Sequence, residues 1–598
     1  MKILSHIMNY MKTTFFGIFI LGCIIGSAIF VGIYGFSIID VTNDTWLLDS
    51  SRTEQLWDLT QHYLGWIFYR NSEWHFPLGL LDGLYSESVS IAYTDSIPLF
   101  AFIFKLLSPI LPETFQYFGL FGLMCYAFMG GFGALITRKF TDSIWINSCS
   151  AFLFSIAPCL LKRMFYHTAL SAHFLILVAF CLWLYRDESF KKRSVYITLW
   201  SILTTVATLI NPYLTPMVLG ILLCSLLQEW IATGKFTPVI SGIIFPCLSI
   251  AVSGYIIGIF YGNVSPSSEG LEDLSFNLLQ FFNPTNYLLS IDNMVYNWED
   301  FNLSLFLPSL PSVSPWQEEG YAYLGLGLIL LLVVSLVTLM IHFIRKEITT
   351  SIDKAKLISI ITSLSICVIV FLFLALSPKA TIGSDILYHI NYPDFIFDIL
   401  SIFRSTGRLI WPVYYGFIAG ILILTIYLFQ KNKKVLYPLF FLIVVVQTVD
   451  LLPGLTYKHN AYTQDFSKEI SNFHSDAWEE LGNNAEEIMF YPSTHFLLYC
   501  NPELSCRFEE YALEYDLSLN ITYMSRNLSD KADQKTYEHF EERIQGIRSP
   551  KTIYVFGLTF DKPDPTLVGL NYYLIDGYVI GTELDLSNYS DVIPYTLE

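Results

Sequence analysis

Long apolar runs separated by polar stretches dominate the chain between residues 14 and 453. Each run is close to the length, about 20 residues, that an α-helix needs to cross the hydrocarbon core of a bilayer. A helix satisfies its own backbone hydrogen bonds in lipid and a lone strand cannot, so we expect membrane helices. The pattern predicts eleven of them, at residues 14–36, 114–137, 144–161, 168–185, 194–211, 213–230, 237–261, 320–344, 355–377, 408–430 and 434–453.

The composition agrees with a membrane protein. Hydrophobic residues make up 53% of the chain, charged residues 14%, and the mean hydropathy is +0.49. A soluble domain has about 25% charged residues. The first run, Phe15 to Ile33, is longer than the apolar region of a typical signal peptide and no clear small-residue cleavage site follows it. We therefore expect it to be a retained first helix.

Lysine and arginine are unevenly distributed between the loops. With the N-terminus in the cytoplasm, the short inner loops carry 16 of these residues, and the longer outer loops up to residue 454 carry 8. The positive-inside rule favours this orientation in the cytoplasmic membrane, and an odd number of spans then places the C-terminal segment outside the cell. The outer segments are 37–113, 262–319, 378–407 and 455–598.

The C-terminal segment is acidic, with 24 Asp or Glu and 10 Lys or Arg, a net charge of −14 out of the chain's −18. This charge argues against nucleic acid as a partner. The pattern predicts strands at 486–493, 551–557 and 571–584, with a hairpin turn at Asp576-Gly577, and an amphipathic helix at 530–547. We expect a transmembrane domain at 1–454, whose first outer loop is about 37–113, and a soluble α/β domain at 455–598.

Known chemical motifs are absent from the sequence. It contains no zinc-type ligand spacing and no nucleophile-elbow, Walker A or dinucleotide-binding motif. Eight of the ten cysteines lie in the apolar runs, where we expect them to serve as small apolar residues. Cys500 and Cys506 share one outer loop, and a disulfide between them is compatible with an oxidising exterior but is not required.

The first outer loop combines acidic residues, a histidine and aromatic residues close to the membrane. Asp58 and His62 are four residues apart, so on a helix they share one face and can meet. Trp66 and its aromatic neighbours are typical of a helix in the membrane interface. Asp95 precedes Pro98 at the start of a second apolar helix, which we also expect to be interfacial. Structural roles are the alternative: a solvated charge for Asp58, an interfacial histidine for His62 and a helix N-cap for Asp95.

Three stretches stand out: DLTQHYLGWIFYR followed by PLG, EEGYAYLGLG at 318–327 and FRSTGRLIWPVYY at 403–415. They resemble an uncharacterised bacterial family of multi-span membrane proteins that is usually placed with the GT-C glycosyltransferases. The first helix, the large outer loop and its two separated acids resemble the GT-C superfamily itself. The run Tyr93-Thr94-Asp95-Ser96-Ile97-Pro98-Leu99 resembles the position of an acidic-Pro-Pro-Leu-type motif in such enzymes. The resemblance implies a GT-C-like fold.

The same resemblance implies a cell-envelope enzyme that moves a sugar from a polyprenyl-phosphate-linked donor to a glycan, lipid or protein acceptor. Inverting transfer needs a base for the acceptor's proton, and Asp58 is our candidate. Asp95 would be a second acid, an alternative base or, with Asp58, a ligand of a divalent metal such as Mg²⁺ or Mn²⁺. His62 would orient Asp58 or meet the leaving phosphate. Many GT-C proteins have two acidic residues close together in this loop, but no adjacent acidic pair precedes Asp58 here. The choice of base therefore stays open.

The implied donor phosphate requires cations on the outer side. Arg404 and Arg408, and Lys162 with Arg163, are the candidates, because a guanidinium suits phosphate oxygens. Their alternative role is anchoring at lipid headgroups. Four residues are candidates for contact with the sugar or acceptor: Tyr93, Glu319, Trp66 and Tyr323. The alternative role of Glu319 is to neutralise an arginine, and that of the aromatic residues is to lie in the membrane interface.

A non-catalytic transporter, flippase or scaffold for lipid-linked glycans is the alternative function. A transporter would bury ionisable residues in the middle of the membrane, where they are costly and usually functional. The predicted spans contain almost none, and the charges gather at the outer rim. This distribution favours the enzyme.

Overall fold

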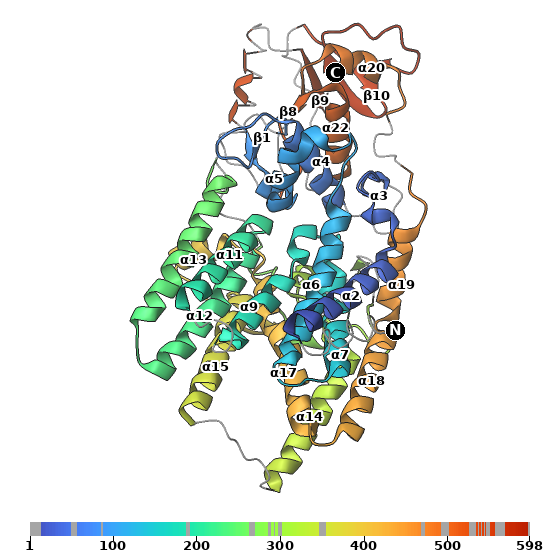
Figure 1. The fold of residues 1–598 in the computed structure, drawn as a ribbon. Helices are drawn as coiled ribbons and strands as arrows, with labels where there is room; N and C mark the ends of the chain where they lie inside the picture. Colours follow the sequence, from blue (N-terminus) through green and yellow to red (C-terminus); the bar gives the residue numbers. More distant parts are fainter. Residues whose placement is uncertain are drawn as a thin grey trace. The chain divides into compact units, whose positions relative to one another are not determined.

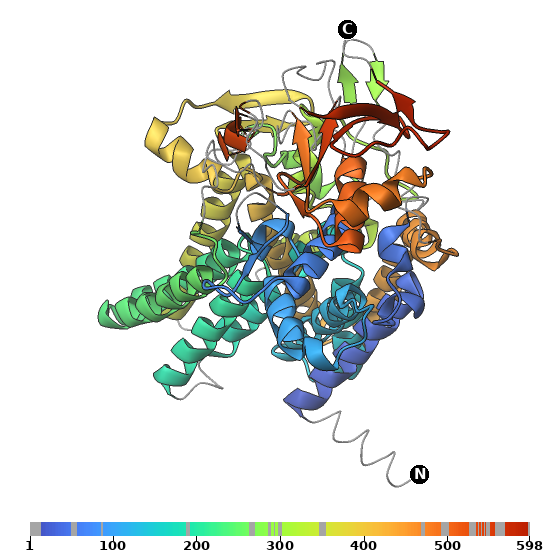
Figure 2. The same ribbon diagram turned by 90° about the horizontal axis from the view of Figure 1, so that it is seen from above.

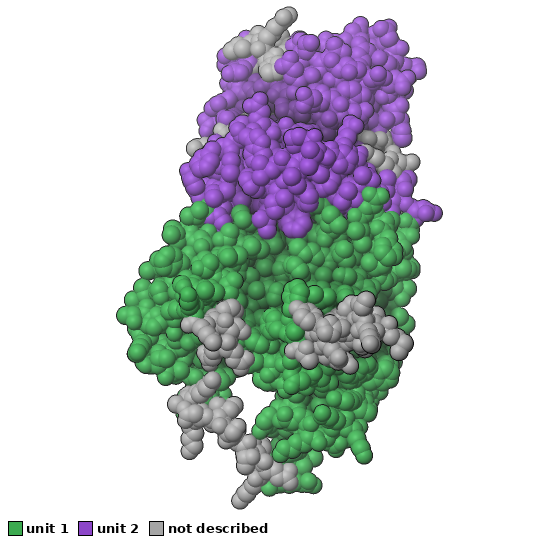
Figure 3. Space-filling model, viewed as in Figure 1, with its two compact units in different colours: residues 1–40, 117–252, 266–464 green, residues 41–116, 253–265, 465–598 purple. Residues whose placement is uncertain are grey.

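The computed structural model of the protein (Figure 1 and Figure 2) describes two compact units (Figure 3). Unit 1 comprises residues 1–40, 117–252 and 266–464, and unit 2 comprises residues 41–116, 253–265 and 465–598. Unit 2 therefore contains the first outer loop together with the C-terminal segment. The described residues are 14–49, 57–84, 88–186, 192–261, 270–284, 289–291, 294–296, 302–345, 354–467, 473–491, 502–525, 551–556 and 569–595, with a few positions between 534 and 545.

Every apolar run predicted from the sequence contains a helix, and these helices lie in unit 1 except for the end of α13 (Figure 1). Among the described residues, nine helices are long and apolar enough to cross a membrane, and the pair α18 and α19, bent by 56°, would be a tenth span. The run at 168–185 forms a shorter apolar helix, Thr168–Leu184. The main helices are α2 (Phe15–Tyr34), α6 (Phe118–Arg138), α7 (Ile144–Ser155), α8 (Pro158–Arg163), α9 (Phe174–Leu184), α11 (Arg193–Ile210), α12 (Leu214–Thr233), α13 (Thr237–Ile256), α14 (Leu326–Ile344), α15 (Lys354–Leu376), α17 (Trp411–Phe429), α18 (Lys433–Asp450) and α19 (Leu452–Thr463).

Glycines bring helices α2 and α6 into backbone contact. A Cβ on Gly26 would lie 2.0 Å from the carbonyl oxygen of Tyr126. A Cβ on Gly130 would lie 2.2 Å from the carbonyl oxygen of Gly22. Lipid provides no hydrophobic force between helices, so close packing across small residues has to hold them together.

Short, irregular elements join the membrane helices of unit 1. Two of the distinctive sequence stretches include residues of such elements, the 3₁₀ helices η6 and η7. Pro315 takes the first position of η6, and the hydroxyl of Ser314 before it accepts a hydrogen bond from the backbone N–H of Trp316 at 3.3 Å. The bounds are η1 (Ser37–Ile39), η4 (Thr168–Ser171), η5 (Leu278–Phe281), β3 (Leu289–Ile291), β4 (Met294–Tyr296), η6 (Pro315–Gly320), β5 (Lys379–Ile382), β6 (Asp385–His389), α16 (Asp394–Ser401) and η7 (Thr406–Ile410).

The first outer loop folds as part of unit 2. Its helix over Trp57–Asn71 was expected to be interfacial, but most of its residues are buried, so it is an interior helix of the unit. The second helix, also expected to be interfacial, has Ile103, Leu106 and Leu107 exposed. The elements are α3 (Thr45–Leu48), α4 (Trp57–Asn71), β1 (Leu80–Leu81), β2 (Val89–Ser90), η2 (Ile91–Thr94), α5 (Pro98–Leu107) and η3 (Ser108–Ile110).

Among the described residues of the C-terminal segment, six strands form a mixed sheet in the order β12-β10-β11-β9-β7-β8. Strand β7 is parallel to β8 and β9, and the other pairs are antiparallel. The predicted strands and the turn at Asp576-Gly577 are confirmed, since both turn residues have positive φ and Ile575 pairs with Tyr578. The helix predicted at 530–547 lies largely outside the described residues. The elements are α20 (Ala477–Asn484), β7 (Glu487–Tyr491), α22 (Pro502–Tyr515), β8 (Ser518–Leu519), β9 (Thr552–Phe556), β10 (Asn571–Ile575), β11 (Tyr578–Thr582) and β12 (Ile593–Pro594).

The contact between α2 and α6 can be tested with Gly26→Ala. The added Cβ forces the helices apart, and we expect a loss of about 1–3 kcal/mol, the usual cost of overpacking. Gly32→Ala in the same helix is the matched control, because a Cβ there meets nothing within 4 Å. The thermal midpoint of the purified protein in detergent should fall only for Gly26→Ala. Equal midpoints for the two variants would contradict the close crossing.

Candidate functional site

Two glycines bring η6 and η7 of unit 1 together. A Cβ on Gly407 would lie 2.9 Å from the backbone nitrogen of Gly320 and 2.8 Å from the carbonyl oxygen of Leu274. The backbone N–H of Gly407 donates to that same carbonyl at 3.0 Å. Glycine is therefore needed at 407 for close approach. The two distinctive stretches around residues 318 and 407 meet at this point.

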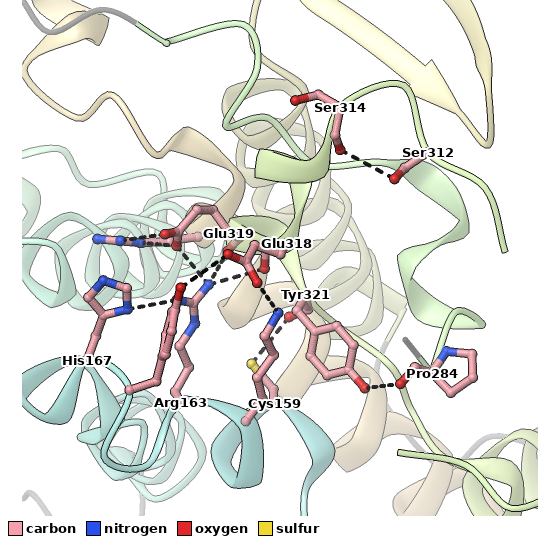
Figure 4. A network of polar contacts seen from close by, with 12 residues as sticks. Cys159, Arg163, His167, Pro284, Ser312, Ser314, Glu318, Glu319 and Tyr321 are labelled. Carbon is pink, nitrogen blue, oxygen red and sulfur yellow. Dashed lines mark hydrogen bonds and ion pairs between the residues drawn. The ribbon is translucent and has the colours of Figure 1, made fainter. Parts of the chain in front are cut away.

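A buried ion network lies beside this contact (Figure 4). Arg408 donates to both carboxylate oxygens of Glu319, at 2.7 and 3.0 Å, and Arg163 reaches the same carboxylate at 2.7 Å. Arg163 also donates to the backbone carbonyls of Glu318 and Glu319, at 3.1 and 3.2 Å. Burial by itself would raise the pKa of Glu319, but the two guanidiniums outweigh it and hold that pKa well below its usual range. Glu319 therefore stays charged.

A second ion pair extends the network. Lys162 donates to the Glu318 carboxylate at 2.9 Å, and its ammonium lies 4.8 Å from the centre of the Tyr321 ring. The five charged side chains, Lys162, Arg163, Arg408, Glu318 and Glu319, carry a net formal charge of +1. Buried charges are stable only when each has partners, and here each of the three cations contacts a carboxylate.

Arg404 and Arg408, both candidates for the donor phosphate, have different surroundings. Ser405 precedes η7, so residues 404 and 408 are not on one continuous helix. Arg408 is buried and satisfied by Glu319, with its guanidinium 4.6 Å from the ring centre of Tyr213. Arg404 is half-buried and makes no ion pair within the part of the chain that the structure describes. Of these two arginines, Arg404 can therefore bind an external anion without breaking an ion pair among the described residues.

Tyr323 lies elsewhere in unit 1 and is fully buried. Its hydroxyl donates to Asp450 at 2.7 Å, and the other oxygen of Asp450 accepts from Ser304. Asp450 also accepts from the backbone N–H of Leu326 at 2.9 Å, the first residue of α14. Tyr323 therefore helps to cap a membrane helix, and its ring offers no exposed face for a sugar.

Asp58 occupies the first turn of α4 in unit 2 and is half-buried. Its carboxylate accepts a hydrogen bond from the hydroxyl of Tyr523, 2.7 Å away. Tyr523 lies in the C-terminal segment, whose helix α22 packs against α4. The C-terminal segment therefore orients an acid of the first outer loop.

His62 is buried, and its Nδ1 has no hydrogen-bond partner among the described residues. The expected contact with Asp58 is therefore not made through that atom. Burial lowers the pKa of His62 to about 3, so the ring is neutral at physiological pH. A neutral, enclosed imidazole is poorly suited to meet a phosphate. Trp66 is likewise fully buried and donates from Nε1 to the carbonyl of Phe115 at 3.0 Å, which makes it a structural residue.

The acid of the second motif, Asp95, sits in a strained turn. Asp95 has φ 51° and Ile97 has φ 53°, a conformation that is unusual for a β-branched residue. The helix N-cap is Ile97, so the N-cap interpretation of Asp95 is wrong. The turn is attached to α4, since the hydroxyl of Ser96 donates to the carbonyl of His62 at 2.6 Å and a Cβ on Gly65 would lie 2.6 Å from Thr94.

Tyr93 is half-buried beside this turn. Its hydroxyl donates to the carbonyl of Ile259 at 2.6 Å, and its own carbonyl accepts from the backbone N–H and the hydroxyl of Ser525. The turn is therefore held by the C-terminal segment as well. No group of three metal-ligand side chains occurs among the described residues.

A hydroxyl network next to Tyr523, the partner of Asp58, was not predicted from the sequence. The buried Glu509 of α22 accepts from Ser505 at 2.8 Å and from Thr522, and Ser505 accepts from the backbone N–H of Tyr523 at 2.8 Å. The apolar residues of α22 recur with helical spacing, which was the available signal for this helix. Cys506, considered for a disulfide, is buried in the same helix, and Cys500 lies outside the described residues.

Family models match most of the chain. The model described as "Domain of unknown function (DUF6311)" matches residues 23–452, and the model described as "DUF6311 C-terminal domain" matches residues 477–583. No curated protein matches the chain. The first match covers the distinctive stretches at 318–327 and 403–415, and the second covers Tyr523 and Glu509.

The hydroxyl network next to Tyr523 predicts a pH dependence of stability. Burial raises the pKa of Glu509 to about 7, above the ordinary value of 4.5. Its contribution to stability is therefore fully present below pH 4.5 and is lost as the pH rises through about 7. We expect a loss of about 3 kcal/mol in total, since one pKa unit corresponds to about 1.4 kcal/mol.

Glu509→Gln, an isostere of the protonated acid, should remove this loss and raise the thermal midpoint at pH 8 relative to the unaltered protein. Glu514→Gln, at an exposed position of the same helix, is the control and should leave the pH profile unchanged. A Glu509→Gln profile that parallels that of the unaltered protein would show that the carboxyl does not titrate in this range.

Proposed function

We propose that this chain, which belongs to the DUF6311 family, is a membrane glycosyltransferase of the GT-C type. In this proposal eleven helices cross the cytoplasmic membrane and the N-terminus lies in the cytoplasm. A sugar passes on the outer face from a polyprenyl-phosphate-linked donor to a glycan, lipid or protein acceptor. The resemblance of the three distinctive stretches is the starting point, and the geometry of the described residues adds support.

The observation that carries the proposal is the setting of Asp58. The carboxylate is oriented by the Tyr523 hydroxyl at 2.7 Å and is still partly open to solvent. A positioned carboxylate of this kind is suited to take a proton from an incoming hydroxyl. The strained turn that carries Asp95 packs against the same helix, which favours a second acid near the base.

The proposed step is an inverting transfer. Asp58 takes the proton of the acceptor hydroxyl while the acceptor oxygen forms a bond to the anomeric carbon of the sugar. The bond from that carbon to the donor's phosphate oxygen breaks, and polyprenyl phosphate leaves with the electron pair. Asp95 remains the alternative base, and a divalent metal held by the two acids stays part of the hypothesis.

Arg404 is the best candidate for the donor phosphate. It is half-buried and unpaired among the described residues, whereas Arg163 and Arg408 share Glu319. The buried network then serves to hold η7, and with it the chain around Arg404, in place. Lys162 and Glu318 belong to that same supporting network.

Asp58→Asn tests the base. We expect transfer to fall by about 100-fold or more, the usual contribution of a positioned general base. The measurement is the surface glycan profile, by mass spectrometry, of cells that lack the protein and are complemented with each variant. Glu73→Gln, at an exposed acid of the same loop, is the matched control and should restore the full profile.

Each outcome separates the alternatives. Full restoration by Asp58→Asn would exclude it as the base. A profile that is the same with and without the unaltered protein would exclude a role in surface glycosylation. Accumulation of the lipid-linked sugar on the inner leaflet in cells without the protein would favour a flippase over a transferase.

Arg404→Gln and Arg408→Gln should fail in different ways. For Arg404→Gln we expect the Kd for polyprenyl phosphate to rise about tenfold, because a charge-assisted contact is lost, at an unchanged thermal midpoint. For Arg408→Gln we expect a loss of about 3 kcal/mol in stability, because a buried pair is broken. Arg345→Gln, at an exposed end of α14, is the control for both measurements. An unchanged Kd for Arg404→Gln would remove this residue from the donor site.

A further inference from the structure

An apolar surface is exposed in the segment of unit 1 between α15 and η7. The hairpin β5–β6 and the helix α16 carry it, and Figure 2 shows them in yellow. Unlike the apolar faces of the candidate spans, these side chains lie on elements too short to cross a bilayer. We name this the 386–402 surface, after its exposed residues: Ile386 (54% exposed), Leu387 (53%), Ile390 (44%), Phe395 (65%), Phe397 (39%), Ile399 (60%) and Ile402 (44%).

Chain connectivity keeps this surface close to the ends of two membrane helices. Candidate spans cover Leu357–Leu376 on one side and Thr406–Phe429 on the other. The segment also folds back on the first of these, because the ring of Tyr392 packs on Phe373 with centroids 6.3 Å apart. Phe373 is three residues before the end of α15, about 5 Å along the helix axis. Part of the segment therefore lies beside the last turn of a span.

Helix α16 is amphipathic in the way that a surface-bound helix requires. Ile396, Ile399 and Leu400 share one face at positions i, i+3 and i+4, with the exposed ring of Phe395 at its edge, while Asp394 and Asp398 lie on the opposite side. A soluble protein rarely leaves such a contiguous apolar patch exposed. A helix with one apolar face and one acidic face instead suits a position in the plane of a membrane surface.

We propose that the 386–402 surface inserts into the headgroup and acyl boundary of the bilayer and anchors the segment between α15 and η7 to the membrane. The charges of the segment identify the occupant as the apolar part of the lipid. Lys379 and Arg404 are outnumbered by Asp385, Asp394 and Asp398, so attraction to anionic headgroups cannot drive the contact. Insertion rests on buried apolar area. It is independent of any sugar transfer by the chain.

Photocrosslinking tests this directly. The intact protein is reconstituted in vesicles of zwitterionic phosphatidylcholine, with benzoylphenylalanine in place of Phe395, Ile399 or Leu387. We expect lipid adducts at 399 at least about fivefold above those at Asp398, because the apolar face of the helix enters the hydrocarbon and the acidic face lies in water. The yield should not change when anionic lipid or salt is added.

Two controls make the result decisive. Benzoylphenylalanine at Ile369, exposed on the candidate span α15, reports lipid contact at a membrane helix and confirms that the vesicles hold folded protein. Benzoylphenylalanine at Leu387, which lies in β6, tests the same surface without changing any residue of α16. Absence of lipid adducts at 387, 395 and 399 while 369 reacts would overturn the proposal. Adducts with a second copy of the chain or another protein, in place of lipid, would also overturn it and identify a docking surface.

Discussion

The irregular elements of unit 1 depend on one interaction, the ion pairing of Arg163 and Arg408 with the carboxylate of Glu319. Removing a charge from water costs several kcal/mol, and only well-placed partners offset that cost. Arg163 comes from the end of α8 and Arg408 from η7, and both meet Glu319 of η6. Each of these elements is too short to be held by its own hydrogen bonds. The ion network therefore fixes the positions of three segments that are 156 and 89 residues apart in sequence.

Backbone contact makes this network possible. Charged side chains meet with bidentate geometry only when their backbones are held at a defined separation, and Gly320 and Gly407 set that separation. The same principle applies in unit 2, where Gly65 admits the turn of Asp95 against α4. The glycines of the distinctive stretches thus act as spacers for the charged residues beside them. Their role is steric, and the chemistry belongs to their neighbours.

The division of the chain into units differs from its order in sequence. The predicted first outer loop and the C-terminal segment form one unit. The Tyr523 hydroxyl donates a hydrogen bond to Asp58, and the Ser525 hydroxyl donates one to the carbonyl of Tyr93. The candidate base is therefore oriented by a residue 465 positions away. Sequence spacing had pointed to His62, because local helical geometry is the only proximity that a single sequence reveals.

The sequence by itself determined the features that depend on local physics. Apolar runs of membrane length became helices, and the Asp576-Gly577 turn joined its strands, because burial, helical hydrogen bonding and turn conformation involve neighbouring residues only. The tertiary structure alone decided which polar side chains are satisfied. Arg408 became an internal partner while Arg404 stayed unpaired among the described residues, and Trp66 and Tyr323 were enclosed. Burial and pairing depend on residues far away in sequence, and the amino-acid pattern does not encode their distances.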